Sequence, residues 1–556
     1  MMSRIRNQRK SILFLWQFLK KEGGLLVLGI VMTGLVSLLT WVGPKIIAYI
    51  IDQGLVPHEH RLAMIGVLVL GAAELARLSS LYLSQLVYAV MGQNVIERVR
   101  AKMVSHLLNL PVAYYDRVSS GKMMTRVVSD VNSLTDFFQS GFVSVLGNFA
   151  GMVAIFVGLM SISLRLGLVL FFSFIPIALA CALFSVQLKK VYELTRNQLS
   201  HLNAMLADFL YGMRTIRSLG SGYEKFQELS RQIERYAAAQ MKMVRTYSLF
   251  HPTLSLGIGI LLLILINMGL PMVSENVMKV GEWVAALSYV LSLQQPLLEI
   301  SDRWNFFLAG MTSIERIMEV FAEVPETVGG VHPARFRAIE FNRVCFAYAE
   351  EQVLNHVNLK IRAGEWLGVY GESGSGKSTL LQMLYGFYHA TEGELLWNGT
   401  SYRELDLKVM RTHFGVIEQF PFLFAGTIAE NISLFGEHQF ELEALKKEFQ
   451  GFSLIESLLN QPNFEINERG SNLSMGQKQM IAFLRAYLAN PDIWILDEAT
   501  AFFDEEAEQE VMLALEKQRN KITVIQVAHR AEALRRMDRL IQISFGQLQD
   551  HRPSLS

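Results

Sequence analysis

The residues with the clearest chemistry lie in a glycine-rich stretch between an apolar segment and a helix-forming one. Residues 366–381 read WLGVYGESGSGKSTLL, in which Gly371 is followed five residues later by Gly376, Lys377 and Ser378. Glycines at this spacing let backbone N–H groups wrap phosphate oxygens, and Lys377 and Ser378 would then reach the β- and γ-phosphates and Mg²⁺. The pattern predicts a nucleoside triphosphate site. Its loop comprises Gly371, Glu372, Ser373, Gly374, Ser375, Gly376, Lys377, Ser378 and Thr379.

A second apolar run, IWILDEAT at 493–500, ends in two adjacent acidic residues. Asp497 at the end of such a strand suits a Mg²⁺ shell, with water between. Glu498 beside it is positioned to orient or deprotonate an attacking water. Adjacent acids are common on surfaces, but an apolar strand before them and a phosphate loop in the same chain favour the catalytic interpretation.

Two regions that meet near residue 325 must position these residues. Six apolar stretches before that point reach the roughly 20 residues needed to cross a bilayer core. They lie at 24–51, 62–90, 136–160, 164–188, 248–271 and 279–303. Lys and Arg concentrate in the long connections 91–135 and 189–247, which predicts that these loops and both termini are cytoplasmic. We therefore expect a multi-pass protein of the cell (inner) membrane.

The predicted fold is multidomain, with an all-α six-helix transmembrane domain before an α/β P-loop domain. We expect a cytoplasmic N-terminus with an elbow helix at 1–23, the transmembrane domain at 24–325 and the nucleotide-binding domain at 326–556. Residues 11–21, SILFLWQFLKK, suit either a short helix in the membrane interface or an extension of the first span. The N-terminus has no convincing cleavable signal.

Charge and cysteine content disfavour other classes of protein. The 51 basic and 51 acidic residues cancel, so no global field favours nucleic acid. The two cysteines, Cys181 and Cys345, are isolated in the sequence. We therefore expect buried structural thiols rather than a disulfide framework or a metal cluster.

Polar groups inside the predicted spans are candidates for substrate contact. An unpaired charge is costly in lipid, so these groups should face one another, the bundle interior or water. Pairing that fixes helix packing and a place in a transport pathway both remain open interpretations. The groups are Glu74, Arg77, Gln294, Gln295 and Glu299.

The segment Leu473-Ser474-Met475-Gly476-Gln477 resembles the signature LSGGQ of the ATP-binding-cassette (ABC) transporters and precedes the second acidic strand. Together with the phosphate loop it makes the chain similar to exporter-type half-transporters over about residues 15 to 548. The resemblance implies ATP and Mg²⁺ as cofactors. It also implies that Ser474, Met475, Gly476 and Gln477 act on the ATP of a second ATPase domain, so a lone chain would be inactive.

Further segments carry the same resemblance. It implies that Gln419, in VIEQFPFLFAGTIAENI, binds Mg²⁺ and senses water, and that Tyr348 stacks on adenine. Asp504, in AFFD, would occupy the D-loop, and His529, in VAHR, would contact the γ-phosphate and help place Glu498. Residues 110–134 and 212–226 resemble the intracellular loops that carry coupling helices.

Several residues depart from the family pattern. Met475 stands where the signature has its first glycine, and its side chain would crowd a nearby phosphate. Phe502 and Phe503 replace smaller D-loop residues. Met480 and Leu484 depart from the QRxxxAR-like sequence that follows the signature in the family. An altered signature beside intact ATP-side residues resembles one member of heterodimeric exporters. Homodimer and heterodimer therefore both remain open.

The resemblance implies an ATPase that exports a substrate as a dimer within the lipid bilayer, by alternating access. The substrate class stays open among peptide, lipid, siderophore and drug-like compounds. Two alternatives remain: an importer with the exporter fold, and a nucleotide-gated channel or regulator that does not pump. Intact Glu498 and the lack of an inserted regulatory segment disfavour the latter.

Overall fold

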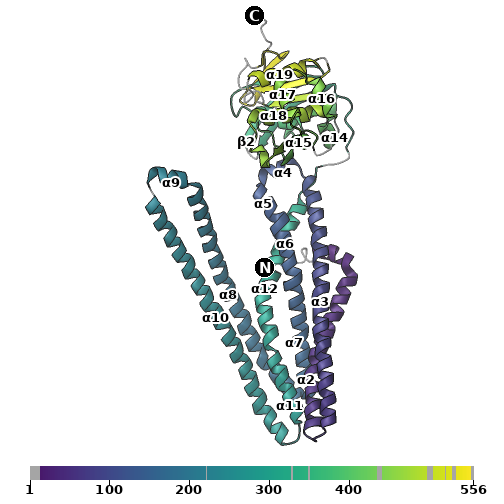
Figure 1. Cartoon of the computed structure of the whole chain (residues 1–556), viewed down its shortest axis with the longest axis vertical. Coiled ribbons are helices and arrows are strands. Elements are labelled where there is room, and N and C mark those ends of the chain that lie inside the picture. The colour runs from purple at the N-terminus through teal and green to yellow at the C-terminus, as the bar shows by residue number, and fades with distance from the viewer. Residues whose placement is uncertain are drawn as a thin grey trace. The chain divides into compact units, whose positions relative to one another are not determined.

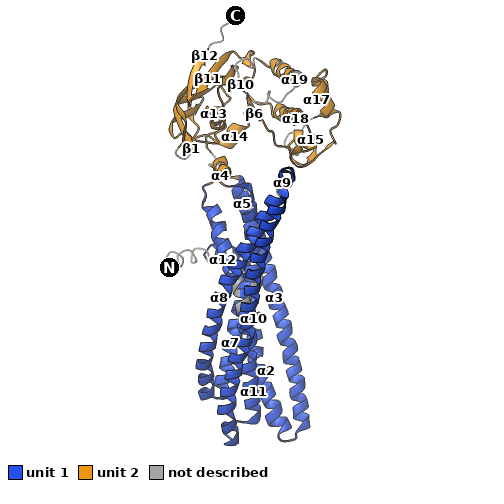
Figure 2. Cartoon of the chain, turned by 90° about the vertical axis from the view of Figure 1, so that its left-hand side faces the viewer, with its two compact units in different colours: residues 1–108, 119–324 blue, residues 109–118, 325–556 orange. Residues whose placement is uncertain are grey.

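The computed structural model forms two compact units (Figure 2). The helical unit, blue in Figure 2, comprises residues 1–108 and 119–324, and the α/β unit, orange, comprises residues 109–118 and 325–556. The structure describes residues 13–220, 222–326, 330–348, 351–434, 441–497, 505–519, 521–528 and 534–551.

The helical unit is built from long helices, purple to teal in Figure 1. They are α2 (Gly23–Tyr49), α3 (His60–Leu108), α7 (Val143–Ile162), α8 (Leu164–Tyr211), α10 (Gly222–Ser274), α11 (Val280–Ser292) and α12 (Gln294–Ala322). Short segments before and between them are η1 (Lys20–Glu22), η2 (Ile50–Leu55), α5 (Ser120–Met124), η3 (Thr125–Asp130), α6 (Val131–Asp136), η4 (Phe137–Phe142) and α9 (Met213–Leu219).

Five helices among the described residues are long and apolar enough to cross a membrane, and they match the first five predicted spans. The sixth predicted span, 279–303, is two helices, α11 and α12, which meet at Leu293. Pro296 in the first turn of α12 gives a physical reason for this break. It has no N–H to donate to the carbonyl of Ser292, four residues earlier.

Helical structure begins before the first predicted span. Residues 13–55 form one helical stretch that runs through η1 into α2. Leu15 and Phe18 are buried in a cluster with Met91 of α3 and Ile314 of α12. The segment 13–21 therefore packs on the helical unit's own core.

Apolar side chains also cover much of the outside of the helical unit. Leu68, Leu183 and Leu263 are 69%, 64% and 68% exposed. Soluble proteins rarely expose contiguous apolar surface on this scale, and such surface marks contact with a membrane or a partner. Lipid is the surrounding that fits these faces.

The α/β unit contains two main sheets. A six-stranded sheet has the order β12-β11-β3-β10-β9-β6, in which only β12 runs antiparallel to its neighbour. Its strands are β3 (Trp366–Tyr370), β6 (Phe414–Ile417), β9 (Ile493–Asp497), β10 (Thr523–Ala528), β11 (Arg539–Ser544) and β12 (Gln547–His551). An antiparallel sheet has the order β2-β1-β4-β5, formed by β1 (Ala338–Tyr348), β2 (Glu351–Arg362), β4 (Glu392–Trp397) and β5 (Thr400–Ser401).

Helices and small elements complete this unit. A two-stranded ribbon pairs β7 (Gly426–Thr427) with β8 (Glu465–Ile466). The helices are α4 (Val112–Arg117), α13 (Lys377–Leu384), α14 (Leu407–Arg411), α15 (Ile428–Ile432), α16 (Leu442–Glu448), α17 (Ser453–Leu459), η5 (Glu468–Gly470), α18 (Met475–Leu488) and α19 (Glu505–Glu516).

The parallel strands are apolar because both of their faces are covered. Successive residues of β3 illustrate this: Trp366 belongs to one hydrophobic cluster, and Leu367 and Val369 belong to another. All three side chains are completely buried. The sheet is therefore a rigid layer between two cores, and it fixes the loops that leave its strand ends.

Candidate nucleotide site

The predicted ATP-binding residues follow the carboxyl ends of neighbouring parallel strands. Val527 of β10 pairs with Val369 of β3 on one side and with Asp497 of β9 on the other. Ile417, the last residue of β6, pairs with Leu496 of β9. The strand register therefore brings the phosphate loop, Asp497 and the segment that contains Gln419 to one edge of the sheet. Ligands of open α/β sheets bind at this edge.

The backbone of the phosphate loop requires its glycines. Gly376 has a φ of +106° and Gly374 a φ of +80°, values that residues with a side chain rarely adopt. A Cβ on Gly371 would lie 2.3 Å from the carbonyl oxygen of Ile543 in β11. The loop thus passes close to β11 at Gly371, and its turns need the conformational freedom of glycine at 374 and 376.

Lys377 provides the positive charge of this loop. Its side chain is only 5% exposed, and Nζ donates to the carbonyl oxygens of Gly371 at 2.8 Å and Glu372 at 2.9 Å. Ser378 is exposed in the first turn of α13, and no side chain caps that turn. An uncapped helix N-terminus beside a buried ammonium group suits a polyphosphate.

Asp497 lies near the far end of α13 as well as at the end of β9. The hydroxyl of Tyr385, which follows α13, is buried and has no hydrogen-bond partner within the described part of the chain. Burial first, and then the carboxylates of Asp497 and Glu418, raise the pKa of Tyr385 well above its ordinary value. The oxygens available from Ser378, Asp497 and Gln419 are the hard donors that Mg²⁺ prefers.

Tyr348 is the last residue of β1 and contacts α13 directly. Its hydroxyl donates to Oε1 of Gln382 at 2.7 Å and accepts from the hydroxyl of Thr379 at 3.4 Å. Its ring is 38% exposed and meets Tyr388 edge-on, with the ring centroids 5.2 Å apart. Tyr348 therefore offers an aromatic surface beside the phosphate-binding helix, as base stacking requires.

The sequence did not indicate a role for Tyr388, whose ring packs against that of Tyr348. The hydroxyl of Tyr388 donates to the carboxylate of Asp116 on α4, within the α/β unit. This bond joins residues 272 positions apart, and no local pattern around Tyr388 indicates it. It connects the predicted adenine-stacking residue to α4, the helix in the predicted first intracellular loop, through one side chain.

The signature segment opens helix α18. Ser474 is its N-cap and forms a capping box with Gln477: the Gln477 N–H donates to the Ser474 hydroxyl at 3.2 Å, and Gln477 Oε1 accepts from the Ser474 N–H at 2.9 Å. The Ser474 hydroxyl can still donate its own hydrogen. Met475 and Gly476 form the first turn, where backbone N–H groups have no partner within the helix. This end of α18 suits an anion.

Helix α18 also holds the Gln419 segment. Gln479, which is fully buried, donates to the carbonyl oxygen of Gln419 at 3.3 Å. Arg485, one turn and a half further along, donates to the carbonyl oxygens of Asn431 at 3.0 Å and Phe422 at 3.2 Å. Sequence reasoning did not find Gln479 or Arg485, although their place inside the signature helix is a usable signal.

The departures from the family pattern have different structural settings. Met480 and Leu484 are 1% and 0% exposed and belong to the core around α18. Their apolar character is explained by packing. Met475 is half-buried at the start of the helix. The predicted catalytic residues Glu498 and His529, the D-loop residue Asp504, and Phe502 and Phe503 lie outside the described residues.

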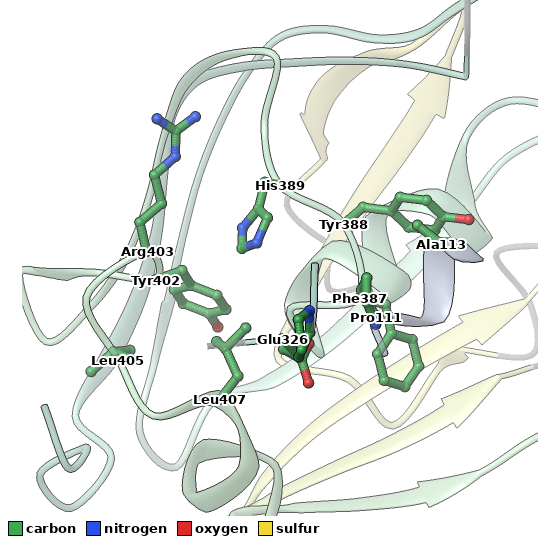
Figure 3. A pocket seen from close by; sticks show the side chains of 11 residues that line it. Pro111, Ala113, Glu326, Phe387, Tyr388, His389, Tyr402, Arg403, Leu405 and Leu407 are labelled. Carbon is green, nitrogen blue, oxygen red and sulfur yellow. The ribbon is translucent and has the colours of Figure 1, made fainter. Parts of the chain in front are cut away.

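A pocket of about 490 Å³ lies elsewhere in the α/β unit, between α4 and the loops after α13 and β5 (Figure 3). Beside it, Arg411 binds Glu326 through two hydrogen bonds of 2.6 and 2.7 Å and donates to the carbonyl of Tyr385 at 3.0 Å. No residue of the phosphate loop lines this pocket. It therefore forms part of the seat of α4 and is separate from the nucleotide site.

Four of the polar groups in the predicted spans have partners within the protein. Arg77 and Glu74 form an ion pair with an Nε–Oε2 distance of 2.8 Å. Glu299 accepts from Asn148 of α7 at 3.0 Å and from Gln295 at 2.8 Å. Gln294 is half-buried at the start of α12. These contacts agree with a packing role, and a role in substrate binding stays a prediction.

Comparison with known families identifies the class of protein. The family model "ABC transporter transmembrane region" matches residues 26–297, and the model "ABC transporter" matches residues 354–501. The chain belongs to the ABC transporters: it is a multi-pass exporter half-transporter whose ATPase domain follows its membrane region. A half-transporter requires a partner of the same kind.

Individual relatives agree with this assignment. The chain is 27% identical to the "ATP-dependent lipid A-core flippase" of Haemophilus influenzae over 512 residues. This match covers 90% of this chain and 87% of the relative. It is 29% identical to the "Probable multidrug resistance ABC transporter ATP-binding/permease protein YheH" of Bacillus subtilis, over 82% and 69% of the two chains. The "Structure of a bacterial Atm1-family ABC exporter with ATP bound" has a TM-score of 0.75 at 20% identity and covers 94% of both chains, which shows a shared fold.

Proposed function

We propose that this chain pairs with a second half-transporter and uses ATP with Mg²⁺ to export an amphiphilic compound of the lipid or drug class from the cytoplasm. The convergence of the phosphate loop, Asp497 and the Gln419 segment at one sheet edge carries the ATP-driven part of this proposal. The names of the relatives, a lipid A-core flippase and a probable multidrug transporter, support the substrate class. The basic loops support a cytoplasmic position for the ATPase domain and both termini.

Each side chain has a chemical task in this proposal. The Lys377 ammonium balances phosphate charge, and the oxygens of Ser378, Asp497 and Gln419 would hold Mg²⁺, which would supply further neutralisation of phosphate charge. Glu498 takes the proton of the attacking water, and His529 helps to place Glu498. Ser474, with the N-terminus of α18, binds the γ-phosphate of the ATP in the partner subunit.

ATP drives transport only if the closed dimer binds it more tightly than the open one. A site shared between two subunits meets this condition, because the signature helix adds its contacts only on closure. The route from Tyr348 through Tyr388 to Asp116 offers a path by which nucleotide occupancy reaches α4. Alternating access follows when such helices transmit the closure to the membrane region.

Inverted membrane vesicles test the proposal. A fluorescent phospholipid and an amphiphilic dye serve as probes, and Glu498→Gln is the matched inactive variant. The proposal predicts ATP-dependent accumulation of at least one probe inside the vesicles and its loss in the variant. Equilibration without accumulation would support the channel alternative, and ATP-dependent depletion from the lumen would support an importer.

The dimer partner requires a separate measurement, because homodimer and heterodimer both remain candidates. The chain, purified alone, is assayed for ATPase activity as a function of ATP concentration. Robust cooperative hydrolysis with Met475 present would establish a homodimer and reject the heterodimer. Activity that appears only with a second, co-expressed half-transporter would establish the heterodimer.

A further inference from the structure

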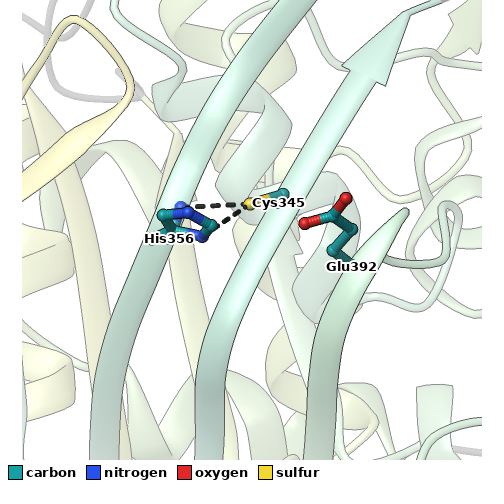
Figure 4. Close-up of side chains that lie close together, drawn as sticks. All are labelled: Cys345, His356 and Glu392. Atoms are coloured by element: carbon teal, nitrogen blue, oxygen red, sulfur yellow. Dashed lines mark hydrogen bonds between the residues drawn. The ribbon is translucent and has the colours of Figure 1, made fainter.

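Three side chains of different chemistry meet on the antiparallel sheet of the α/β unit, apart from the nucleotide-binding edge (Figure 4). They are Cys345 on β1, His356 on β2 and Glu392 on β4, and their sulfur, ring nitrogen and carboxylate oxygen all lie within 4.8 Å of one another. The predicted ATP site uses none of them. The isolated position of Cys345 in the sequence gave no sign of this cluster.

The sulfur of Cys345 lies at the centre of the cluster. Its side chain is 4% exposed, and Sγ is 3.0 Å from Nδ1 of His356. The backbone N–H of His356 also donates to Sγ, at 3.3 Å. His356 and Glu392 are themselves exposed. The cluster thus has a buried sulfur and two outer groups that solvent reaches.

Strand register explains how the three residues converge. Cys345 and Glu392 are direct partners in the pairing of β1 with β4. On the other side, the register of β1 with β2 shifts between Val344 and Phe346, which places a bulge opposite Cys345. His356 lies in this bulge with a φ of +48°, an uncommon conformation for a residue with a side chain. A bulge re-aims a side chain, and here the ring points at Sγ.

We propose that Cys345, His356 and Glu392 form a binding site for a borderline-soft divalent cation, with Zn²⁺ as the best match. Thiolate, imidazole and carboxylate are the three ligand types that Zn²⁺ takes, whereas Mg²⁺ and Ca²⁺ prefer oxygen alone. Three protein ligands leave the fourth tetrahedral position to water. The exposed sides of His356 and Glu392 give the ion a path of entry.

The geometry requires a small adjustment. Zn–S and Zn–N bonds of about 2.3 and 2.0 Å in a tetrahedron place ligand atoms about 3.5 Å apart. The Sγ–Nδ1 contact of 3.0 Å must open slightly, and the carboxylate must approach from within 4.8 Å. Rotation of the exposed His356 and Glu392 side chains supplies both movements without disturbing the core.

Cation binding would connect three adjacent strands. β1 lies between β2 and β4, so one ion held by all three fixes the segment that leads to Tyr348. Cys345 precedes Tyr348 by three residues, about 10 Å along a strand. The ion would therefore stabilise the sheet that presents the predicted adenine-stacking residue, without taking part in the nucleotide site.

The test uses the full-length protein in detergent, purified with a tag that contains no histidine, stripped of metal and kept reduced. Zn²⁺ binding is measured by titration calorimetry, and Co²⁺ serves as a spectroscopic probe because a thiolate ligand gives it an intense charge-transfer band. We expect one ion per chain and a cobalt–thiolate band. Cys345→Ser should abolish the band and weaken Zn²⁺ binding by more than about 100-fold, since loss of an outer-shell partner alone costs 10- to 100-fold.

Matched controls separate this site from others. Cys181→Ser removes the other cysteine, and Glu394→Gln removes another acid of β4; both should leave the band and the affinity unchanged. His356→Gln removes an exposed ligand, so it tests the site even if Cys345→Ser fails to fold. A band that survives Cys345→Ser, or Zn²⁺ affinity unchanged in His356→Gln, would overturn the proposal and leave a hydrogen-bonded Cys–His pair only.

Discussion

The hydrogen bond between Tyr388 and Asp116 provides a quantitative test of how nucleotide binding reaches the first intracellular loop. Tyr388→Phe removes only the hydroxyl that donates to the Asp116 carboxylate. The ring remains, and with it the edge-on contact with Tyr348 at 5.2 Å. The change therefore loosens the seat of α4 while it leaves the nucleotide-binding residues intact.

The magnitude follows from the setting of the bond. A hydrogen bond to a charged group contributes about 1.5–3 kcal/mol. Asp116 is exposed and Tyr388 is half-buried, so water competes for the carboxylate and reduces this value to about 1 kcal/mol. One kcal/mol is about a fivefold change in an equilibrium constant. We therefore expect α4 to undock about five times more often in the variant.

Hydrogen exchange measures this directly. Helix α4 has six residues, too few for a stable isolated helix, so its amides exchange when it leaves its seat. Protection of residues 112–117 should fall about fivefold in Tyr388→Phe, while the affinity for ATP stays the same. Asp116→Ala should give a similar loss, and the double variant should lose no more than either single variant.

Three results would refute this reasoning. Unchanged protection of α4 in Tyr388→Phe would mean that the bond does not hold the helix. Additive effects of Asp116→Ala and Tyr388→Phe would mean that the two residues act independently. A large loss of ATP affinity would show that Tyr388 belongs to the nucleotide site itself.

Three further predictions concern the ATPase domain. Lys377→Ala should weaken ATP binding about 10- to 100-fold, the value of a charge-assisted contact of about 1.5–3 kcal/mol, as measured by equilibrium titration; an unchanged affinity would contradict the role of Lys377. Tyr385→Phe should raise the unfolding free energy by about 1–3 kcal/mol, because it removes a buried hydroxyl without a hydrogen-bond partner among the described residues, and a lower melting temperature would contradict this. Met475→Gly should increase the maximal ATPase rate of the assembled transporter by relieving crowding at the partner's phosphate, whereas an unchanged or lower rate would show that Met475 does not limit hydrolysis.

Much of the architecture follows from the sequence because its signals are local. The apolar stretches 24–51 and 164–188 predict helices, and α2 and α8 begin within one residue of them. The phosphate loop is local in the same sense: strand, glycines and helix are contiguous, so residues 366–381 define it. The break in the sixth span is a subtler case. Its cause, Pro296, is visible in the sequence, but the length of the predicted stretch 279–303 indicated a single helix.

Departures from a family pattern could be noticed in the sequence but not explained there. Met480 and Leu484 stood out beside the signature in the same way as Met475. The structure separates them, because the first two are core residues of α18 and Met475 is at the helix start. Whether a side chain faces a core or a ligand depends on what packs against its helix, and that is a tertiary property.

The sequence by itself determined the class of this protein: apolar runs of membrane length, a phosphate loop, and a signature segment before an acidic strand. Only the tertiary structure decided which distant groups meet. Tyr388 contacts Asp116 across 272 positions, and a register shift between β1 and β2 brings His356 beside Cys345. Motifs that bind through contiguous backbone can be read along the chain. Contacts between side chains on different strands and helices depend on register and packing, which no short stretch of sequence encodes.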